Sequence, residues 1–344
     1  MPANNQDLHT ARTNAADEFY TDYSDIQKEV MPEQHIVYDF ENKRVFCPCD
    51  DYKKSNFYKF FKDNFKELRL KELIALSYPS EQHVRYDGTQ ESVIDNNIMY
   101  GKFDVVDDGD FAGLLSNKLL QESDVVVTNP PFSKFRQFFT NLLKSGKEFL
   151  ILGNINAVTY REVFPSIVEN KVWLGHSIHS GDRKFYVPDY YPLSGTACGT
   201  DEENRRYVRV KGVRWFTNMH YSGFIRKKES NFVLTETYSE DKYKKFDTYD
   251  AINVNSYKEI PYDYDGQMGC PITVLDKMDQ YGLIYLVRRV DENHSYSILY
   301  NVKGMLNSGN HSEYYDFKKP IVDGKCKFKR IIIQKITEPN NRSF

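Results

Sequence analysis

The stretch DVVVTNPPFSKFRQFF, residues 124–139, decides the fold. Its four consecutive β-branched residues predict a strand that is buried on both faces. The strand must stop at Asn129-Pro130-Pro131-Phe132, because proline lacks an N–H and fixes φ. An amphipathic helix is expected next, capped by Ser133 and ended by Gly146. Its apolar face comprises Phe135, Phe138, Phe139, Leu142 and Leu143.

Similar signals flank this stretch on both sides. Strands are predicted at 44–49, 72–78 and 148–152, and helices at 17–30, 55–65 and 111–121. This alternation predicts the α/β class, with a doubly wound, Rossmann-like sheet in a domain over residues 17–174. Ligands of such sheets lie outside the carboxyl ends of the strands. We therefore expect the Cys47–Asp51 turn, Gly109–Phe111 and Asn129–Phe132 to meet there.

The two ends of the chain have a different character. Residues 1–16 are polar, and we expect a disordered tail. From about residue 175 the loops lengthen and the apolar runs become short, which predicts a smaller, mixed β-rich region over 175–344. Basic runs at 205–228 and 325–330 include aromatic residues. They fit a nucleic-acid surface and equally an ordinary solvated surface.

Composition narrows the class of protein. The chain has 344 residues, 40% of them hydrophobic, and a net charge of −3, as expected of a soluble globular protein. We find no apolar run of membrane-spanning length and no signal segment, so we expect a cytoplasmic protein without membrane contacts. Five cysteines argue against a disulfide framework. Cys47 and Cys49 lack a second close pair, so we expect no zinc site and no metal in the chemistry.

The Asn-Pro-Pro-Phe tetrapeptide has its own chemistry. An Asn at the end of a buried strand directs its amide oxygen into the ligand crevice, and the Pro130 carbonyl offers a second acceptor beside it. Pro131 holds that carbonyl outward, and Phe132 supplies a flat face. Two acceptors beside an aromatic platform suit the exocyclic amine of a planar base, which they align for attack on a methyl donor. The alternative is a Pro-Pro turn that only ends the strand.

Several segments together resemble the EcoRI-type adenine-specific (N6) DNA methyltransferases. They are DEFYT (17–21), VFCPCDD (45–51), GDF (109–111), VVVTNPPFSKFR (125–136), GNINAVTYREVFP (153–165), GVRWFTN (212–218) and YDAINVNSYKEIPYDYDGQMGCPITVLDK (249–277). The resemblance spans about residues 17–335, in the order cofactor segments, catalytic segment, target recognition. Two features depart from the wider superfamily. CPCDD replaces the glycine-rich turn after the first strand, and no acid follows the second strand, where Ser77-Tyr78-Pro79 stands.

The resemblance implies transfer of a methyl group from S-adenosylmethionine to the N6 amine of an adenine flipped out of duplex DNA. Residues 175–344 would recognise the target. The implied catalytic residues are Asn129, Pro130, Pro131 and Phe132. The implied cofactor contacts are Tyr20, Thr21, Cys47, Pro48, Cys49, Asp50, Asp51, Asp110, Phe111 and Asn129. For DNA contacts we expect the basic residues Arg183, Lys184, Arg205, Arg206, Arg209, Lys211 and Arg214, provided that several of them share one face.

Other functions remain open at this stage. The same chemistry could act on RNA adenine or on a protein glutamine amide, although amide targets usually go with Tyr in place of Phe132. A non-enzymatic module that binds nucleic acid or senses the cofactor is the third alternative, and the intact tetrapeptide argues against it. We expect a monomer in a restriction-modification or phage setting, without a stably bound endonuclease. The family analogy suggests a GAATTC-like target sequence.

Overall fold

The computed structural model describes residues 19–76, 82–95, 113–193, 195–222, 234–277, 286–288, 292–294, 296–302, 315–316 and 319–335. The chain forms two compact units. Unit 1 comprises Met1–Asn154 with Gly175–Tyr221, and unit 2 comprises Ile155–Leu174 with Ser222–Phe344. This division differs from the expected boundary after residue 174, because residues 175–221 belong to the first unit and residues 155–174 to the second.

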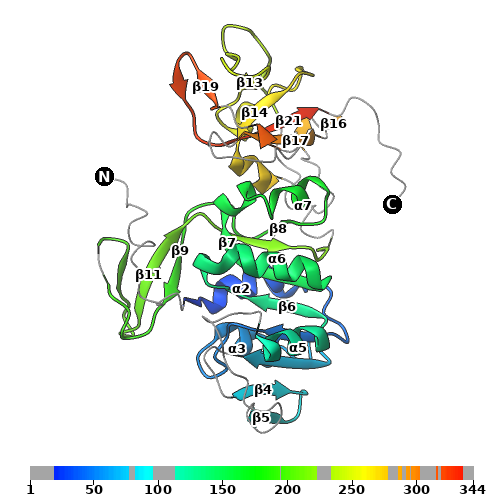
Figure 1. Ribbon diagram of the computed structural model, residues 1–344, viewed down its shortest axis with the longest axis vertical. Helices are drawn as coiled ribbons and strands as arrows, with labels where there is room; N and C mark the ends of the chain where they lie inside the picture. The colour runs from blue at the N-terminus through cyan, green and yellow to red at the C-terminus, as the bar shows by residue number, and fades with distance from the viewer. Residues whose placement is uncertain are drawn as a thin grey trace. The chain divides into compact units, whose positions relative to one another are not determined.

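Unit 1 is built on a large mixed sheet whose neighbouring strands run in the order β5-β4-β3-β2-β6-β7-β12 (Figure 1). Its four central strands are parallel, as the α/β prediction requires. They are β3 (Glu72–Leu76), β2 (Arg44–Cys47), β6 (Val125–Thr128) and β7 (Glu148–Asn154). All four residues of β6 are buried, which confirms the inference from its β-branched run. The strands added in antiparallel fashion are β4 (Gln82–Tyr86), β5 (Glu91–Asp95) and β12 (Val213–Thr217).

The order of the strands creates a switch point between β2 and β6. From β2 the chain passes through α3 (Asn56–Asp63) to β3 on one side. It returns through α5 (Leu114–Glu122) to β6 on the other side of β2. The carboxyl ends of β2 and β6 therefore lie at the position where open α/β sheets bind ligands.

Helices cover both faces of this sheet, and two adjacent residues of β12 show how. Trp215 meets Phe57 of α3, with ring centroids 5.9 Å apart. Phe216 meets Phe135 of α6 (Phe135–Ser145) at 5.3 Å. Because successive side chains of a strand point to opposite faces, α3 and α6 lie on opposite sides of the sheet. Both aromatic residues are fully buried, so they belong to the core and not to a nucleic-acid surface.

The helix ends agree with the prediction in part. Ser55 caps α3, since its hydroxyl oxygen accepts the N–H groups of Phe57 and Tyr58. Gly146 ends α6 in the left-handed region, at φ 66°. The predicted cap by Ser133 is wrong, because a short 3₁₀ turn (η2, Phe132–Lys134) precedes α6, which has no side-chain cap. The helix expected over 17–30 is α2 (Tyr23–Val30), which Asp22 caps.

A second, smaller sheet in unit 1 has the order β1-β9-β11-β10 and is antiparallel throughout. Its strands are β1 (Tyr20–Thr21), β9 (Asp182–Tyr186), β11 (Arg206–Lys211) and β10 (Cys198–Thr200). The sequence placed the strands after residue 175 in a separate β region. Instead, the N-terminal β1 pairs with β9, and β12 completes hydrogen bonds along the edge of β7.

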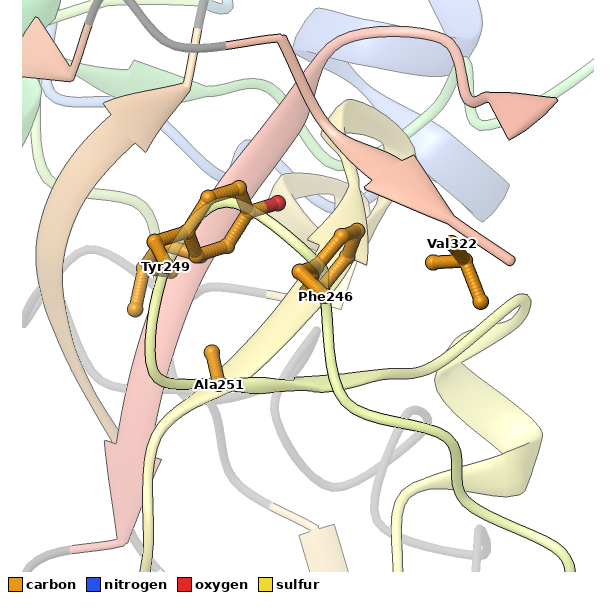
Figure 2. Close-up of a cluster of buried hydrophobic side chains, with 5 residues drawn as sticks. Phe246, Tyr249, Ala251 and Val322 are labelled. Atoms are coloured by element: carbon orange, nitrogen blue, oxygen red, sulfur yellow. The ribbon is translucent and has the colours of Figure 1, made fainter. Parts of the chain in front are cut away.

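Unit 2 is rich in β structure. Its main sheet has the order β13-β14-β21-β17-β18. The bounds are β13 (Ile252–Asn253), β14 (Met268–Pro271), β21 (Arg330–Lys335), β17 (Tyr296–Val302) and β18 (Tyr315–Asp316). Phe246, Tyr249, Ala251, Val322 and Ile332 form a buried cluster beside it (Figure 2). The rings of Phe246 and Tyr249 stack at 4.3 Å.

The remaining elements are short. In unit 2 they are η3 (Ile155–Thr159), α7 (Phe164–Val168), β8 (Trp173–Leu174), η4 (Tyr257–Glu259), η5 (Ile272–Lys277), β15 (Leu286–Arg288), β16 (Glu292–His294), β19 (Ile321–Val322) and β20 (Lys325–Cys326). In unit 1 a further 3₁₀ turn, η1, spans Pro32–Gln34. Within the described ranges, no helix is long and apolar enough to cross a membrane.

Candidate active site

Three strand ends meet at Asp50, which lies three residues beyond β2. Its backbone N–H donates to the carbonyl of Leu76, the last residue of β3, at 3.2 Å. Its Oδ2 accepts the hydroxyl proton of Thr128, the last residue of β6, at 2.7 Å. The turn at 47–51 and the tetrapeptide at 129–132 therefore meet at one edge, as predicted. The third expected segment, with Asp110 and Phe111, lies outside the described residues.

The side chain of Asn129 has a fixed orientation. Its Nδ2 donates to the backbone carbonyl of Phe19 at 2.9 Å. Since a carbonyl can only accept, the amide nitrogen must face Phe19 and Oδ1 must point the other way. Oδ1 is buried and has no hydrogen-bond donor among the described residues. A buried acceptor without a donor costs free energy, so this oxygen is ready to accept from a ligand.

The two prolines separate the next turn from the strand. The N–H of Lys134 donates to the carbonyl of Pro131 at 3.0 Å, which starts the 3₁₀ turn before α6. No backbone N–H in the described part of the chain donates to the Pro130 carbonyl. Pro130 is buried and Pro131 is half-buried. The Pro130 carbonyl thus remains an available acceptor next to Asn129.

Two buried aromatic rings contact the half-buried Phe132. Its ring centroid lies 5.8 Å from that of Phe19 and 6.1 Å from that of Phe185, at interplanar angles of 55° and 80°. Phe19 also meets Tyr191 at 5.9 Å. These tilted contacts hold the Phe132 ring in place. The sequence reasoning missed Phe185, although in RKFYV (183–187) it alternates with half-buried polar neighbours, as an inward-facing strand residue does.

The expected cofactor segment at β1 contains one notable polar atom. The Thr21 hydroxyl is buried and has no hydrogen-bond partner within the described ranges, while the Thr21 carbonyl accepts from Nδ2 of Asn56 at 2.7 Å. Tyr20 is half-buried and pairs with Tyr186 of β9. This buried hydroxyl lies two residues along the chain from Phe19, whose carbonyl holds Asn129, and it fits a polar ligand at this edge.

The CPCDD turn has little free side-chain chemistry. Cys47 and Pro48 are buried, so only their backbone could line a ligand, and Cys49 is half-buried. Burial and the nearby Asp50 raise the pKa of both thiols well above the ordinary range, so both stay neutral. The Asp51 carboxylate accepts the Lys53 N–H at 3.0 Å and shapes the turn before α3.

Asp50 is the buried acid of this site, with 7% of its surface exposed. Burial raises its pKa to about 6, although hydrogen bonds from the hydroxyls of Ser55 and Thr128 oppose the shift. The Ser55 hydroxyl donates to Oδ1 at 2.5 Å, opposite the Thr128 bond to Oδ2. Both carboxylate oxygens therefore have a donor.

The seven basic residues expected to contact DNA fall into two groups. The first group is Lys184, Arg205, Arg209 and Lys211, in or next to the strands β9 and β11 of the small sheet. In the register of β9 and β11, Lys184 pairs with Arg209, and Asp182 pairs with Lys211. These residues share the face of the small sheet that carries Tyr186 and Tyr207, because directly paired residues point to the same side. Lys184 lies 4.9 Å from the Tyr186 ring, Arg205 lies 4.3 Å from the same ring, and Arg209 lies 5.7 Å from the Tyr207 ring.

The other three are bound to backbone carbonyls. Arg183 donates to the carbonyls of Asp182 and Ser180. Arg206 donates to the Tyr191 carbonyl. Arg214 is 3% exposed and donates to the carbonyls of Val213 and His179. These guanidinium groups satisfy the protein's own carbonyls, so the structure separates them from the exposed cations.

Comparison with known proteins adds family information to this geometry. The family model described as "Adenine-specific methyltransferase EcoRI" matches residues 7–336. The chain is 40% identical to Type II methyltransferase M.EcoRI of Escherichia coli, over 96% of this chain and 97% of that protein. It is 33% identical to M.MpnI of Mycoplasma pneumoniae, over 95% and 97%, and 35% identical to M.MgeORF184P of Mycoplasma genitalium, over 78% and 82%. Both are also named Type II methyltransferases. No solved structure gives a significant match.

Proposed function

We propose a residue-level mechanism from the premise that the chain belongs to the EcoRI family of adenine-specific methyltransferases, whose model matches residues 7–336. With relatives named Type II methyltransferases at 33 to 40% identity, it is a site-specific DNA methyltransferase of a restriction-modification type that acts on adenine N6. RNA adenine and protein glutamine gain no support from these relatives.

Asn129 and Pro130 capture the target amine in this proposal. The Asn129 Oδ1 and the Pro130 carbonyl each accept one hydrogen of the adenine N6 amine, while the Phe132 ring stacks on the base. The observation that carries the proposal is the buried Oδ1, which has no hydrogen-bond donor among the described residues and whose direction is fixed by the Phe19 carbonyl. Two acceptors draw the nitrogen toward tetrahedral geometry and free its lone pair. No strong base is needed, because the methylated amine loses its extra proton readily to solvent.

The methyl donor we assign is S-adenosylmethionine, which supplies an electrophilic methyl group when bound. Two observations support a Rossmann-like cofactor site at this edge: the switch point between β2 and β6, and the buried Thr21 hydroxyl, which has no partner in the part of the chain that the structure describes. Tyr20, Thr21 and the 47–51 turn would hold the cofactor. The roles of Asp110 and Phe111 rest on the family resemblance alone.

Duplex DNA is the substrate, and the target adenine must leave the helix to reach a half-buried tetrapeptide. We assign phosphate contacts to four cations of the small sheet, namely the exposed Arg205, Arg209 and Lys211 and the half-buried Lys184. We leave Arg183, Arg206 and Arg214 out of this set because they bind backbone carbonyls. We also propose that residues 175–344 recognise the target sequence. We further propose a cytoplasmic monomer without a stably bound endonuclease.

A labelling experiment tests the function. The protein is incubated with S-adenosylmethionine carrying a labelled methyl group and with duplex DNA, RNA or protein extract, and N6-methyladenine is mapped by sequencing. We expect label in duplex DNA at one short sequence. Label in RNA or protein but not in DNA would contradict the proposal.

A substitution tests the site itself. Asn129→Ala should lower turnover at least about a hundredfold with cofactor binding retained, because it removes an acceptor from the reacting amine. The matched control is Lys144→Ala, an exposed position on the helix that follows the tetrapeptide, with wild-type turnover expected. An active Asn129→Ala enzyme would mean that the amine is bound elsewhere.

A further inference from the structure

Asp50 has an arrangement that the assignment of cofactor contacts does not explain. Its carboxylate lies between two hydroxyl groups, 2.5 Å from Ser55 Oγ and 2.7 Å from Thr128 Oγ1. Asp50, Ser55 and Thr128 are 7%, 3% and 0% exposed. A fully buried pair of hydroxyl donors aimed at one carboxylate is costly to build unless the geometry itself is useful.

The two hydroxyls belong to segments with different tasks. Ser55 is the N-cap of α3, and its oxygen accepts the N–H groups of Phe57 at 3.0 Å and Tyr58 at 3.3 Å. Thr128 ends β6 and immediately precedes Asn129. The Asp50 N–H adds a bond to the end of β3. One residue thus joins the carboxyl ends of three strands and the start of a helix.

We propose that Asp50 is a positioning residue: its ionised carboxylate holds Thr128, and through Thr128 it sets the position of the Asn129 side chain that receives the target amine. The inference rests on the proposed function of Asn129. It differs from the role that the family resemblance gives Asp50. A direct cofactor ligand would mainly change cofactor affinity, whereas a positioning residue mainly changes turnover.

The protonation state of Asp50 decides whether both bonds can form. An ionised carboxylate accepts both hydroxyl protons, but a protonated one keeps its own O–H on one oxygen and disturbs that bond. The titratable groups beside it are the thiols of Cys47 and Cys49, which remain neutral. With the pKa of Asp50 raised to about 6, the arrangement is intact at neutral pH and opens as the pH falls through that value.

The test uses three variants of the full chain. Thr128→Val removes the hydroxyl but keeps the buried shape, and Thr128→Ser restores a hydroxyl. Asp50→Asn removes the titration. Turnover on duplex DNA at saturating S-adenosylmethionine and the dissociation constant of the cofactor are measured from about pH 5 to pH 8, with circular dichroism as the check on folding.

We expect Thr128→Val to lower turnover roughly tenfold, the effect of one lost hydrogen bond to a charged group, and Thr128→Ser to restore it. Cofactor affinity should stay close to wild type in both. The acid inflection of turnover should be lost in Thr128→Val, because no hydroxyl remains at position 128 for the ionised carboxylate to hold. It should vanish in Asp50→Asn.

Two results would overturn the inference. One is a Thr128→Val enzyme with wild-type turnover or with weakened cofactor binding alone. The other is an Asp50→Asn enzyme that keeps the acid inflection. Both presuppose an active wild type, so they are distinct from failure of the proposed function, in which the wild type itself methylates no DNA. If Thr128→Val does not fold, Asp50→Asn and its pH profile still decide.

Discussion

The carboxyl edge of the large sheet and the tyrosine-bearing face of the small sheet differ in the burial of their polar side chains. The edge buries them, and the face leaves most of them exposed to solvent. At the edge, each oxygen of the buried Asp50 carboxylate has one hydroxyl donor, from Ser55 or Thr128, and the buried Asn129 Oδ1 has no donor within the described residues. On the small sheet, Lys184, Arg205 and Arg209 lie over tyrosine rings. Buried groups with single partners should respond to substitution sharply, and exposed cations that share partners should respond gradually.

The largest effect is expected at Arg214, a basic residue that is buried like the polar groups at the carboxyl edge of the large sheet. Arg214→Ala should lower the free energy of unfolding by about 4 kcal/mol. The substitution removes the guanidinium donor from the carbonyls of Val213 and His179, and it also removes packing. Arg209→Ala, at a half-exposed position in the preceding strand β11, is the matched control and should change the free energy of unfolding by less than about 0.5 kcal/mol. Urea unfolding of both variants measures the difference. Equal losses would erase the contrast between the two arginines.

The second effect concerns pH and stability. Asp50 has a folded-state pKa of about 6 against an ordinary value of 3.8, so the folded chain holds its proton more tightly than the unfolded chain. This group stabilises the fold below pH 4, and its contribution is lost as the pH rises through about 6. The total change is about 3 kcal/mol from the size of the shift.

The Asp50→Asn variant isolates that contribution. Its unfolding free energy minus that of the wild type should rise by about 3 kcal/mol between about pH 4 and pH 7, since the amide does not titrate. The measurement is chemical denaturation across this range. A difference that is flat with pH would mean that Asp50 is better solvated than its burial indicates. The expected rise would mean that ionised Asp50 lowers the stability of the fold while it holds Thr128 in position.

The sequence predicted the core of the large sheet because its signals are local. The β-branched run at 125–128 and the apolar spacing of Phe57, Phe60 and Phe61 each determine one element without distant contacts. Strand β12 was missed because Arg214 interrupts its apolar pattern, and only the structure shows that its guanidinium binds carbonyls inside the fold.

The site was predictable to the extent that it is contiguous. Asn129–Phe132 could be read from a buried strand that runs into two prolines. The Phe19 carbonyl that orients Asn129 lies 110 residues away, and Thr128 lies 78 residues from Asp50. Hydrogen bonds across such separations leave no pattern in the chain. The same holds for the aromatic contact between Phe132 and Phe185.

The third prediction, of intermediate size, concerns the ring of Phe132 at the carboxyl edge of the large sheet. Phe132→Ala should lower kcat/KM on duplex DNA roughly thirtyfold, since stacking of one base on an aromatic ring contributes about 2 kcal/mol. Phe132→Tyr keeps the ring and should retain most of the activity. The comparison uses methylation rates at several DNA concentrations. If Phe132→Ala matches the wild type, the ring only packs against Phe19 and Phe185 and does not contact the base.

The smallest effects should come from single substitutions of the cations on the tyrosine-bearing face of the small sheet. Arg205 and Lys184 both pair with Asp201, and Arg209 pairs with Asp182, so each of these three cations already has a counter-charge. A phosphate would have to compete with these acids. Each change of Lys184, Arg205, Arg209 or Lys211 to Gln should therefore weaken DNA binding only about two- to fivefold.

The dependence of binding on salt gives the sharper measurement. Each cation that contacts a phosphate should reduce the slope of log affinity against log salt by about 1 when it is replaced, whatever the DNA sequence. The control is Lys66→Gln, an exposed lysine remote in sequence from the small sheet, which should leave the slope unchanged. Arg209→Gln and Lys66→Gln could both give the slope of the wild type. In that case the cations over the tyrosine rings stabilise the small sheet without contacting phosphates, and the duplex contacts another surface.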